Sequence, residues 1–187
     1  MDQRQLVEQA RGGDHDAFAA LAHVSVARLE AVARLILGDP ELARDAVQEA
    51  YIRAWRDLPG LRDPDRFDAW LRRLTVNACL DAARRHRRRP IEVAIGEIDT
   101  RDPGDMTTML ADRDLIERAF SGLEPAMRAV LVLHFYADLT MPAVADALGV
   151  PLGTAQSRLA RALAAMRRTI DAGDSTEHPA ERRGQFA

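Results

Sequence analysis

Apolar residues recur at three- and four-residue spacing along most of the chain, which is the period of helices that bury one face. In the first 89 residues this pattern predicts helical segments over residues 5–11, 16–37, 40–58 and 66–89. Turns rich in glycine and proline separate them, since these residues interrupt helices. Runs of β-branched residues are short, so we expect an all-α fold.

The helical pattern breaks down over residues 90–112 and returns over 113–170, with helices predicted near 115–123 and over 125–137. The broken stretch carries prolines, glycines and acids, with eight acidic residues between Glu92 and Glu117. We therefore predict two small helical domains, residues 1–89 and 113–170, joined by an acidic flexible linker over 90–112. The polar tail, residues 171–187, is predicted to be disordered.

The stretch from Met141 to Ala160 has the spacing of a helix-turn-helix. Thr140 stands where the first helix is capped, and Gly149 stands where it ends. A longer helix follows over about residues 153–170. Its inner side is predicted to carry Leu159, Leu163 and Met166. The second helix of such a motif enters the DNA major groove.

This last predicted helix is basic. No acid occurs between Asp146 and Asp171, whereas four arginines do: Arg158, Arg161, Arg167 and Arg168. Such a helix attracts phosphate oxygens, and Gln156, Ser157 and Arg158 are placed to reach base edges. An arginine-bearing outer helix of an ordinary bundle is the alternative that this stretch alone leaves open.

The net charge of the chain limits where nucleic acid can bind to its surface. All 26 basic residues are arginine and the net charge is −3, so DNA contact has to come from local patches. The strongest patch is residues 84–89, with five arginines around His86. Arginine near a helix C-terminus is stabilised by the helix dipole. Five arginines are more than this stabilisation requires, so we expect them to contact phosphate or RNA.

The chain offers little for catalysis. Its five histidines are scattered, and no metal-binding, nucleophile or phosphate-loop motif is present. We therefore expect no enzymatic activity, no metal and no cofactor. Cys79, the single cysteine, stands in an apolar run where a buried inert thiol is expected, with a redox sensor as the minor alternative.

No stretch of the sequence approaches the roughly 18 apolar residues of a membrane span, and the first residues lack the apolar core of a signal peptide. We therefore expect a cytoplasmic protein without membrane insertion.

Asp45, Gln48 and Glu49 share one outer face of the predicted helix over residues 40–58, because they are three and four positions apart. Arg53 continues the row. An ion-paired surface or a protein contact is expected on this face.

Two stretches in this order resemble one known family. ARDAVQEAYIRAWRDL and RFDAWLRRLTVNACLDAARRHRRR, preceded by LVEQARGGDHDAFAAL, resemble region 2 of bacterial RNA polymerase sigma factors of the extracytoplasmic-function (ECF) group. LEPAMRAVLVLHFYADLTMPAVADALGVPLGTAQSRLARALAAMR resembles region 4 of the same group. Either match alone is less specific than the two in the right order.

The resemblance implies roles for named residues. The implied segment for binding core polymerase, through the clamp helices of its β′ subunit, is Asp45, Ala46, Val47, Gln48 and Glu49. The implied contacts to the melted −10 element, from the loop over residues 61–66 and the helix after it, are Arg62, Arg66, Arg73, Asn77, Arg84, Arg85, Arg87 and Arg88. The implied contacts to the −35 element are Thr154, Gln156, Ser157, Arg158 and Arg161.

The function implied by the resemblance is that of a promoter-specificity subunit. Its implied partners are core RNA polymerase (the β′ clamp helices and the β subunit), promoter DNA and an anti-sigma protein, and the acidic linker is expected to thread the path of the nascent RNA. The chain departs from the family pattern at Pro142, Ala143 and Ala155, which leaves the −35 sequence open.

Two alternatives belong to other classes. One is a helix-turn-helix regulator that binds duplex DNA without polymerase, and the other is a helical adaptor that binds no DNA. The double match counts against the first, and the arginine-bearing, acid-free last helix counts against the second.

Overall fold

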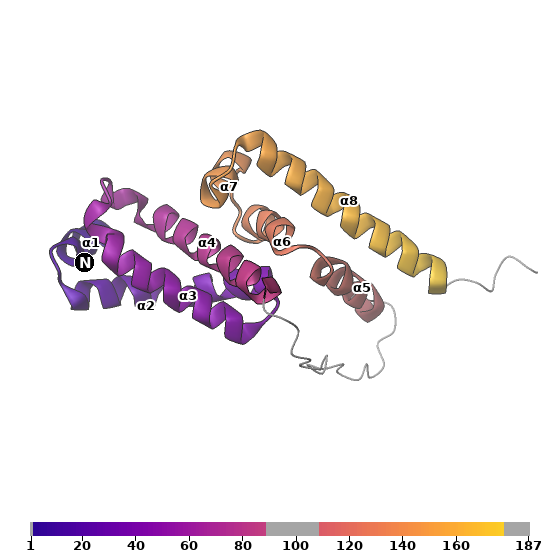
Figure 1. Cartoon of the computed structure of the whole chain (residues 1–187), viewed down its shortest axis with the longest axis horizontal. Coiled ribbons are helices and arrows are strands. Elements are labelled where there is room, and N and C mark those ends of the chain that lie inside the picture. The colour runs from indigo at the N-terminus through magenta and orange to yellow at the C-terminus, as the bar shows by residue number, and fades with distance from the viewer. Residues whose placement is uncertain (1, 89–108, 178–187) are drawn as a thin grey trace, which may run out of the picture.

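The computed structural model describes residues 2–88 and 109–177, and within these ranges all regular structure is helical. The predicted all-α class is confirmed. The elements are α1 (Gln3–Arg11), α2 (His15–Leu37), α3 (Pro40–Asp57), η1 (Leu58–Gly60), η2 (Pro64–Arg66), α4 (Phe67–Arg88), α5 (Met109–Ser121), α6 (Pro125–Leu131), η3 (Val132–Tyr136), α7 (Met141–Leu148) and α8 (Leu152–Glu177). Helices α1–α4 and α5–α8 form two bodies that lie side by side (Figure 1).

The turn between α2 and α3 has the predicted chemistry. α2 ends at Gly38, whose φ of 72° lies in the left-handed region that favours glycine. The Asp39 carboxylate then caps α3 by accepting hydrogen bonds from the backbone N–H groups of Glu41 and Leu42, at 2.9 and 3.0 Å. Pro40 occupies the first turn, where its missing N–H is not needed.

Small residues let α3 lie close to its neighbours α2 and α4. The buried positions of α3 are mostly alanines at helical spacing: Ala43, Ala46, Ala50 and Ala54. The distance between packed helix axes depends on the side chains at the contact. The alanine row therefore brings the two long helices α2 and α4 around α3, with α1 packed on α2.

Helices α7 and α8 form the predicted helix-turn-helix. Gly149 ends α7 in the left-handed region with φ 63°, as the sequence indicates. Thr140 is at the N-cap position of α7, but its hydroxyl makes no capping hydrogen bond. Helices α5, α6 and α7 all pack against α8.

The inner face of α8 differs from the predicted one by one position. Leu163 is 42% exposed, whereas Ala155 and Ala162 are completely buried. Leu159 and Met166 are partly buried, as predicted. The buried row therefore runs 155, 159, 162, 166. The prediction for Leu163 was wrong because a leucine gives a stronger hydrophobic signal than an alanine, although Ala155 and Ala162 lie on the buried side of the helix.

Helix α8 is also longer than the sequence pattern indicates. It continues to Glu177 instead of ending at Ile170. Between these two positions no proline interrupts the helix. The remainder of the predicted tail, residues 178–187, lies outside the described residues.

The helix predicted over residues 125–137 is not uniform. Its α-helical part ends at Leu131, and the wider π-helical turn η3 follows. The change in winding leaves Phe135 64% exposed while Leu133 is completely buried. Helix α5 begins at Met109, inside the predicted linker, and residues 90–108 of that linker lie outside the described residues.

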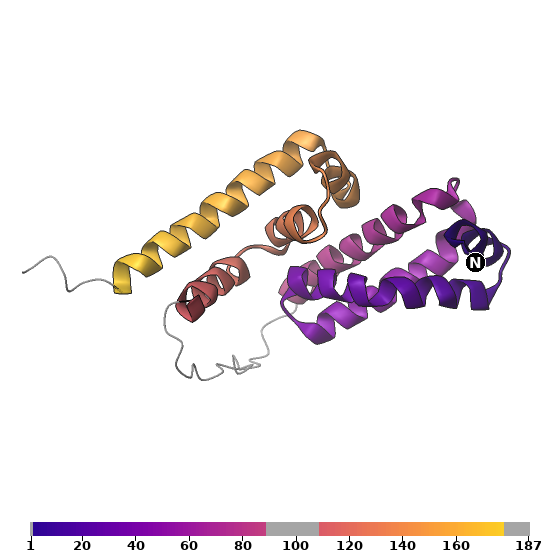
Figure 2. The same cartoon turned by 180° about the vertical axis from the view of Figure 1, so that it is seen from behind.

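The two bodies share apolar packing. α6 and η3 pack on α2, while α6 and α7 pack on α4. Figure 2 shows the two bodies from behind. The main cluster of buried apolar residues accordingly includes Ile36 and Val76 from the first body and Val130, Leu133 and Val144 from the second. Over the residues that are described, none of the helices is long and apolar enough to cross a membrane.

Candidate nucleic-acid interface

The end of α4 is a basic surface. Arg84, Arg85, Arg87 and Arg88 are all exposed, and Arg84 pairs with Asp81 one turn earlier. Arg73 is exposed three turns before this cluster on the same helix. Because arginine keeps its charge and presents several N–H donors, this side of α4 is suited to phosphate oxygens.

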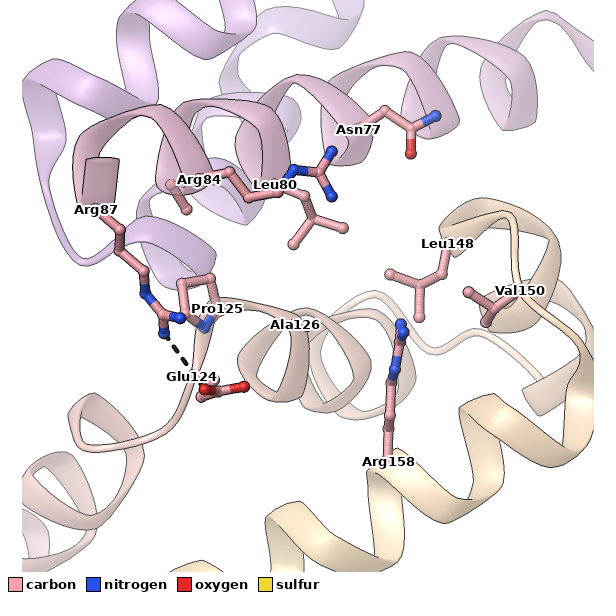
Figure 3. A pocket seen from close by; sticks show the side chains of 11 residues that line it. Asn77, Leu80, Arg84, Arg87, Glu124, Pro125, Ala126, Leu148, Val150 and Arg158 are labelled. Atoms are coloured by element: carbon pink, nitrogen blue, oxygen red, sulfur yellow. Dashed lines mark ion pairs between the residues drawn. The ribbon is translucent and has the colours of Figure 1, made fainter. Parts of the chain in front are cut away.

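A cavity of about 280 Å³ lies where α4 faces the second body (Figure 3). Asn77 and Leu80 line it from α4, together with Arg84 and Arg87. On the other side, the side chain of Arg158 points into it from α8 (Figure 3). The cavity therefore brings together residues to which the family resemblance gives two different promoter elements.

Two ion pairs cross between the bodies beside this cavity. The guanidinium of Arg87 is 3.6 Å from the carboxylate of Glu124, and that of Arg73 is 3.9 Å from the carboxylate of Asp146. Both pairs are exposed to solvent, so each contributes little to stability. Both arginines are among those to which the family resemblance gives contacts with −10 DNA, and here each is paired with a carboxylate of the second body.

The loop before α4 is ordered by its own polar groups. Asp63 accepts a hydrogen bond from the backbone N–H of Asp65 at 3.1 Å, and the Asp65 carboxylate pairs with Arg4 of α1 at 2.9 Å. Arg62 and Arg66 are exposed on this loop. The hydrogen bond and the ion pair hold the loop backbone from which these two arginines extend into solvent.

Trp70 is half-buried, with its ring 6.1 Å from that of the fully buried Phe67. It packs on the apolar cluster. These contacts are those of a core residue.

The recognition helix presents only some of its assigned residues to solvent. Gln156, Ser157 and Arg161 are exposed, whereas Thr154 and Arg158 are half-buried. The Ser157 hydroxyl donates to the carbonyl of Thr154 at 3.0 Å, and Arg161 Nε donates to the carbonyl of Ser157 at 3.3 Å. Ala155 is completely buried beneath them.

The polar face of α3 lies on a different helix from both arginine-bearing surfaces. Asp45 and Gln48 are exposed and Glu49 is half-buried, while Ala46 and Val47 are buried in the helix bundle. Only the three polar side chains of this segment can therefore meet a partner directly.

Glu49 is held on this face by an ion pair. Its carboxylate accepts a hydrogen bond from Arg53 at 2.8 Å, and Arg53 also reaches Asp81 of α4 at 3.4 Å. The hydrogen bond to Glu49 raises the pKa of Arg53.

Comparison with known proteins agrees with this arrangement. Residues 24–89 match the family model for Sigma-70 region 2, and residues 113–166 match that for Sigma-70 region 4. The chain is 34% identical over 169 residues to the ECF RNA polymerase sigma factor SigM of Mycobacterium tuberculosis. The aligned part covers 89% of this chain and 83% of the relative. The chain belongs to the ECF sigma factor family.

Two further relatives support the assignment of this sigma factor. It is 33% identical over 150 residues to the RNA polymerase sigma-E factor of Streptomyces avermitilis, covering 80% of this chain and 83% of the relative. Its fold is similar to that of CnrH, solved in complex with the cytosolic domain of CnrY. That match has a TM-score of 0.63 and 27% identity, and it covers 91% of this chain and 97% of CnrH.

The family assignment gives the two bodies their names. Helices α1–α4 contain region 2 and helices α5–α8 contain region 4. As a sigma factor, the chain binds core RNA polymerase and directs promoter-specific transcription initiation.

Three residues at the contact between regions 2 and 4 were not singled out from the sequence: Glu124, Arg128 and Asp146. Each meets a residue far away in the chain, namely Arg87, Leu37 and Arg73 respectively. Helical periodicity describes one element at a time, so it carries no signal for such contacts.

Other titratable groups of the sigma factor have structural explanations. His134 makes a 2.8 Å hydrogen bond through Nδ1 with the carbonyl of Leu139. Across residues 2–88 and 109–177, no three histidines, cysteines or carboxylates gather as metal ligands. Cys79 is completely buried in region 2, and burial raises the pKa of its thiol to about 12.

We expect Cys79 to be inert in the folded sigma factor, because both burial and the high pKa suppress the thiolate. Iodoacetamide at pH 8 should label the native chain on the order of a thousandfold more slowly than the chain unfolded in urea. Mass spectrometry of timed samples measures both rates. Comparable labelling rates for the native and the unfolded chain would contradict an inert thiol and favour a redox role for Cys79.

Proposed function

We propose that this sigma factor uses three separate surfaces in initiation. Asp45, Gln48 and Glu49 bind core polymerase, most directly the β′ clamp helices. The loop 61–66 and the basic side of α4 bind the melted −10 element, and the start of α8 binds the −35 element. The β subunit is a further expected contact of the chain.

The observation that carries this proposal is the placement of the three surfaces on different helices. The acidic and amide side chains of α3 lie on a different helix from the arginines of α4 and from Gln156, Ser157 and Arg161 of α8. A single strand needs a basic groove, and duplex DNA admits a helix in its major groove. A helix-turn-helix regulator acting without polymerase leaves the α3 face and the basic region 2 surface without a use.

The remaining parts of the proposal concern regulation and chemistry. An anti-sigma protein is proposed as a further partner, supported by the likeness to CnrH in its complex with the cytosolic domain of CnrY. The chain itself is proposed to make and break no bonds, and to act in the cytoplasm, where transcription takes place. The domain boundaries are proposed as residues 1–89 and 113–170, with the linker at 90–112.

Reconstituted transcription with core polymerase tests the function. We expect the purified chain to associate with core and to initiate at discrete sites in a genomic fragment library, mapped by sequencing RNA 5′ ends. If it neither associates with core nor initiates anywhere, while binding specific duplex DNA alone, the regulator without polymerase is the correct function.

The core-binding surface is tested by changing Gln48 and Glu49 together to alanine. Loss of two polar interface contacts should weaken core binding about tenfold, since about 1.4 kcal/mol corresponds to a factor of ten. The matched control replaces Glu8 and Gln9 on α1, both exposed, with alanine. Competition against a second sigma factor measures the affinity, and equal affinities for the two double variants would contradict the assignment.

The region 4 surface is tested by the salt dependence of binding. If Arg158 and Arg161 each neutralise one phosphate, replacing both with alanine should flatten the slope of log affinity against log salt by about two units. The slope is measured with holoenzyme on a promoter fragment. Arg167→Ala with Arg168→Ala removes the same charge further along α8, and an equal change for both pairs would argue against a special role for Arg158 and Arg161.

A further inference from the structure

Gly153 is a glycine that the fold of residues 2–88 and 109–177 does not require. It lies in the first turn of α8, where glycine is less favourable than alanine because it loses more backbone freedom on folding. Its φ lies outside the left-handed region that favours glycine. A Cβ atom built on it would meet no atom of the described residues within 4 Å. The folded chain therefore has room for a side chain at this position.

Other glycines in the described part of the chain have a reason within the fold. Gly13, Gly38 and Gly149 have φ values of 96°, 72° and 63°. At Gly12, which ends α1, a Cβ atom would lie only 3.2 Å from a backbone carbonyl oxygen. These positions need glycine for their backbone conformation or for a close internal contact. Gly153 has neither reason, so its explanation has to come from outside the folded chain.

The first turn of α8 is uncovered on its outer side. Pro151 and Gly153 are exposed, and Leu152 is 42% exposed. The first completely buried residue of the helix is Ala155, which begins the row that packs inside region 4. Because that packing uses the other side of α8, a partner can reach the first turn without displacing any described part of the chain.

Gly153 shares a helix face with the proposed −35 contacts. Gln156 and Ser157 follow it by three and four positions and are exposed. The Ser157 hydroxyl and Arg161 Nε both donate to backbone carbonyls of α8 itself, at 3.0 and 3.3 Å. These hydrogen bonds keep both side chains near the helix surface. DNA read by this face therefore has to come close to the helix backbone.

The major groove leaves little space around a helix that enters it. The groove is about 12 Å wide, and a helix with its side chains is about 10–12 Å across. In a helix-turn-helix, the N-terminal residues of the second helix are those that contact base edges. A position without a side chain at this end allows the closest approach of the helix backbone to the DNA.

We propose that Gly153 is a positioning residue of the −35 contact. Its missing side chain lets the start of α8 approach duplex DNA closely enough for Gln156 and Ser157 to reach base edges. The inference rests on the proposed function and adds a residue to the −35 surface. The glycine then serves the DNA complex, while the free chain would be more stable with alanine at this position.

Gly153→Ala separates these two effects by their direction. Alanine forms helices better and fits the free chain, so the variant should melt at a temperature roughly 1–3 °C higher, measured by circular dichroism. Holoenzyme with the variant should bind a promoter fragment, taken from a mapped start site, about tenfold more weakly, because a methyl group takes space that the DNA needs. Fluorescence anisotropy measures this affinity.

Gly122→Ala is the matched control. Gly122 is an exposed glycine of region 4 without a positive φ, and a Cβ atom there would lie no closer than 3.5 Å to its nearest neighbour, the carbonyl of Arg118. This variant should bind the fragment as the parent does. A shortened fragment that keeps the −10 element and lacks the −35 duplex is the second control, and Gly153→Ala should bind it as tightly as the parent. Gly153→Gln, with a longer side chain, should lose more affinity for the full fragment than Gly153→Ala.

Equal binding of the full fragment by the parent and Gly153→Ala would overturn the inference. A lower melting temperature for Gly153→Ala would also overturn it, since glycine would then serve the fold. So would weaker binding of this variant to core in the competition assay, since polymerase and not DNA would then occupy the space. Failure of the proposed function gives a different result, because the parent holoenzyme itself would then initiate nowhere.

Discussion

The apolar contact of α2 and α4 with α6, η3 and α7 is the interaction on which the arrangement of this sigma factor depends. Polar links also join the two bodies: the hydrogen bond of Arg128 to Leu37 and the ion pairs Arg73–Asp146 and Arg87–Glu124. Val130, Leu133 and Val144 have no water-exposed surface in the packed state. Together with Ile36 and Val76 they belong to one buried apolar cluster that spans both regions.

Arg73 and Arg87 have different partners in the structure and in the proposed promoter complex. In the structure they face carboxylates of region 4, and in the proposed complex they face phosphates and unpaired bases. Exposed ion pairs are weak and screened by salt, so this exchange of partners is inexpensive. On the proposed core-binding face of α3, Asp45 and Gln48 are exposed, while Glu49 is paired with Arg53.

Much of the fold could be predicted from the sequence because its determinants are local. The turn at Gly38 and Asp39 and the end of α7 at Gly149 depend on backbone conformation and capping over a few residues. The inner face of α8 was predicted less well, because alanine at 155 and 162 gives a weak hydrophobic signal and Leu163 a strong one. The π-helical turn at Val132–Tyr136 has no sequence signature that periodicity detects.

The candidate site was predictable in part for the same reason. The arginines at the end of α4 and the polar face of α3 stand out along the sequence. By contrast, the contact of Arg128 with Leu37 joins residues far apart in the chain and appears only in three dimensions.

The distance between regions 2 and 4 tests this account most directly. Dyes at His23→Cys and Arg118→Cys, in a Cys79→Ala background, report it by single-molecule energy transfer. We expect one short distance in the free chain and an increase of tens of ångströms in the promoter complex with core polymerase. A distance in the free chain as long as that in the complex would contradict it.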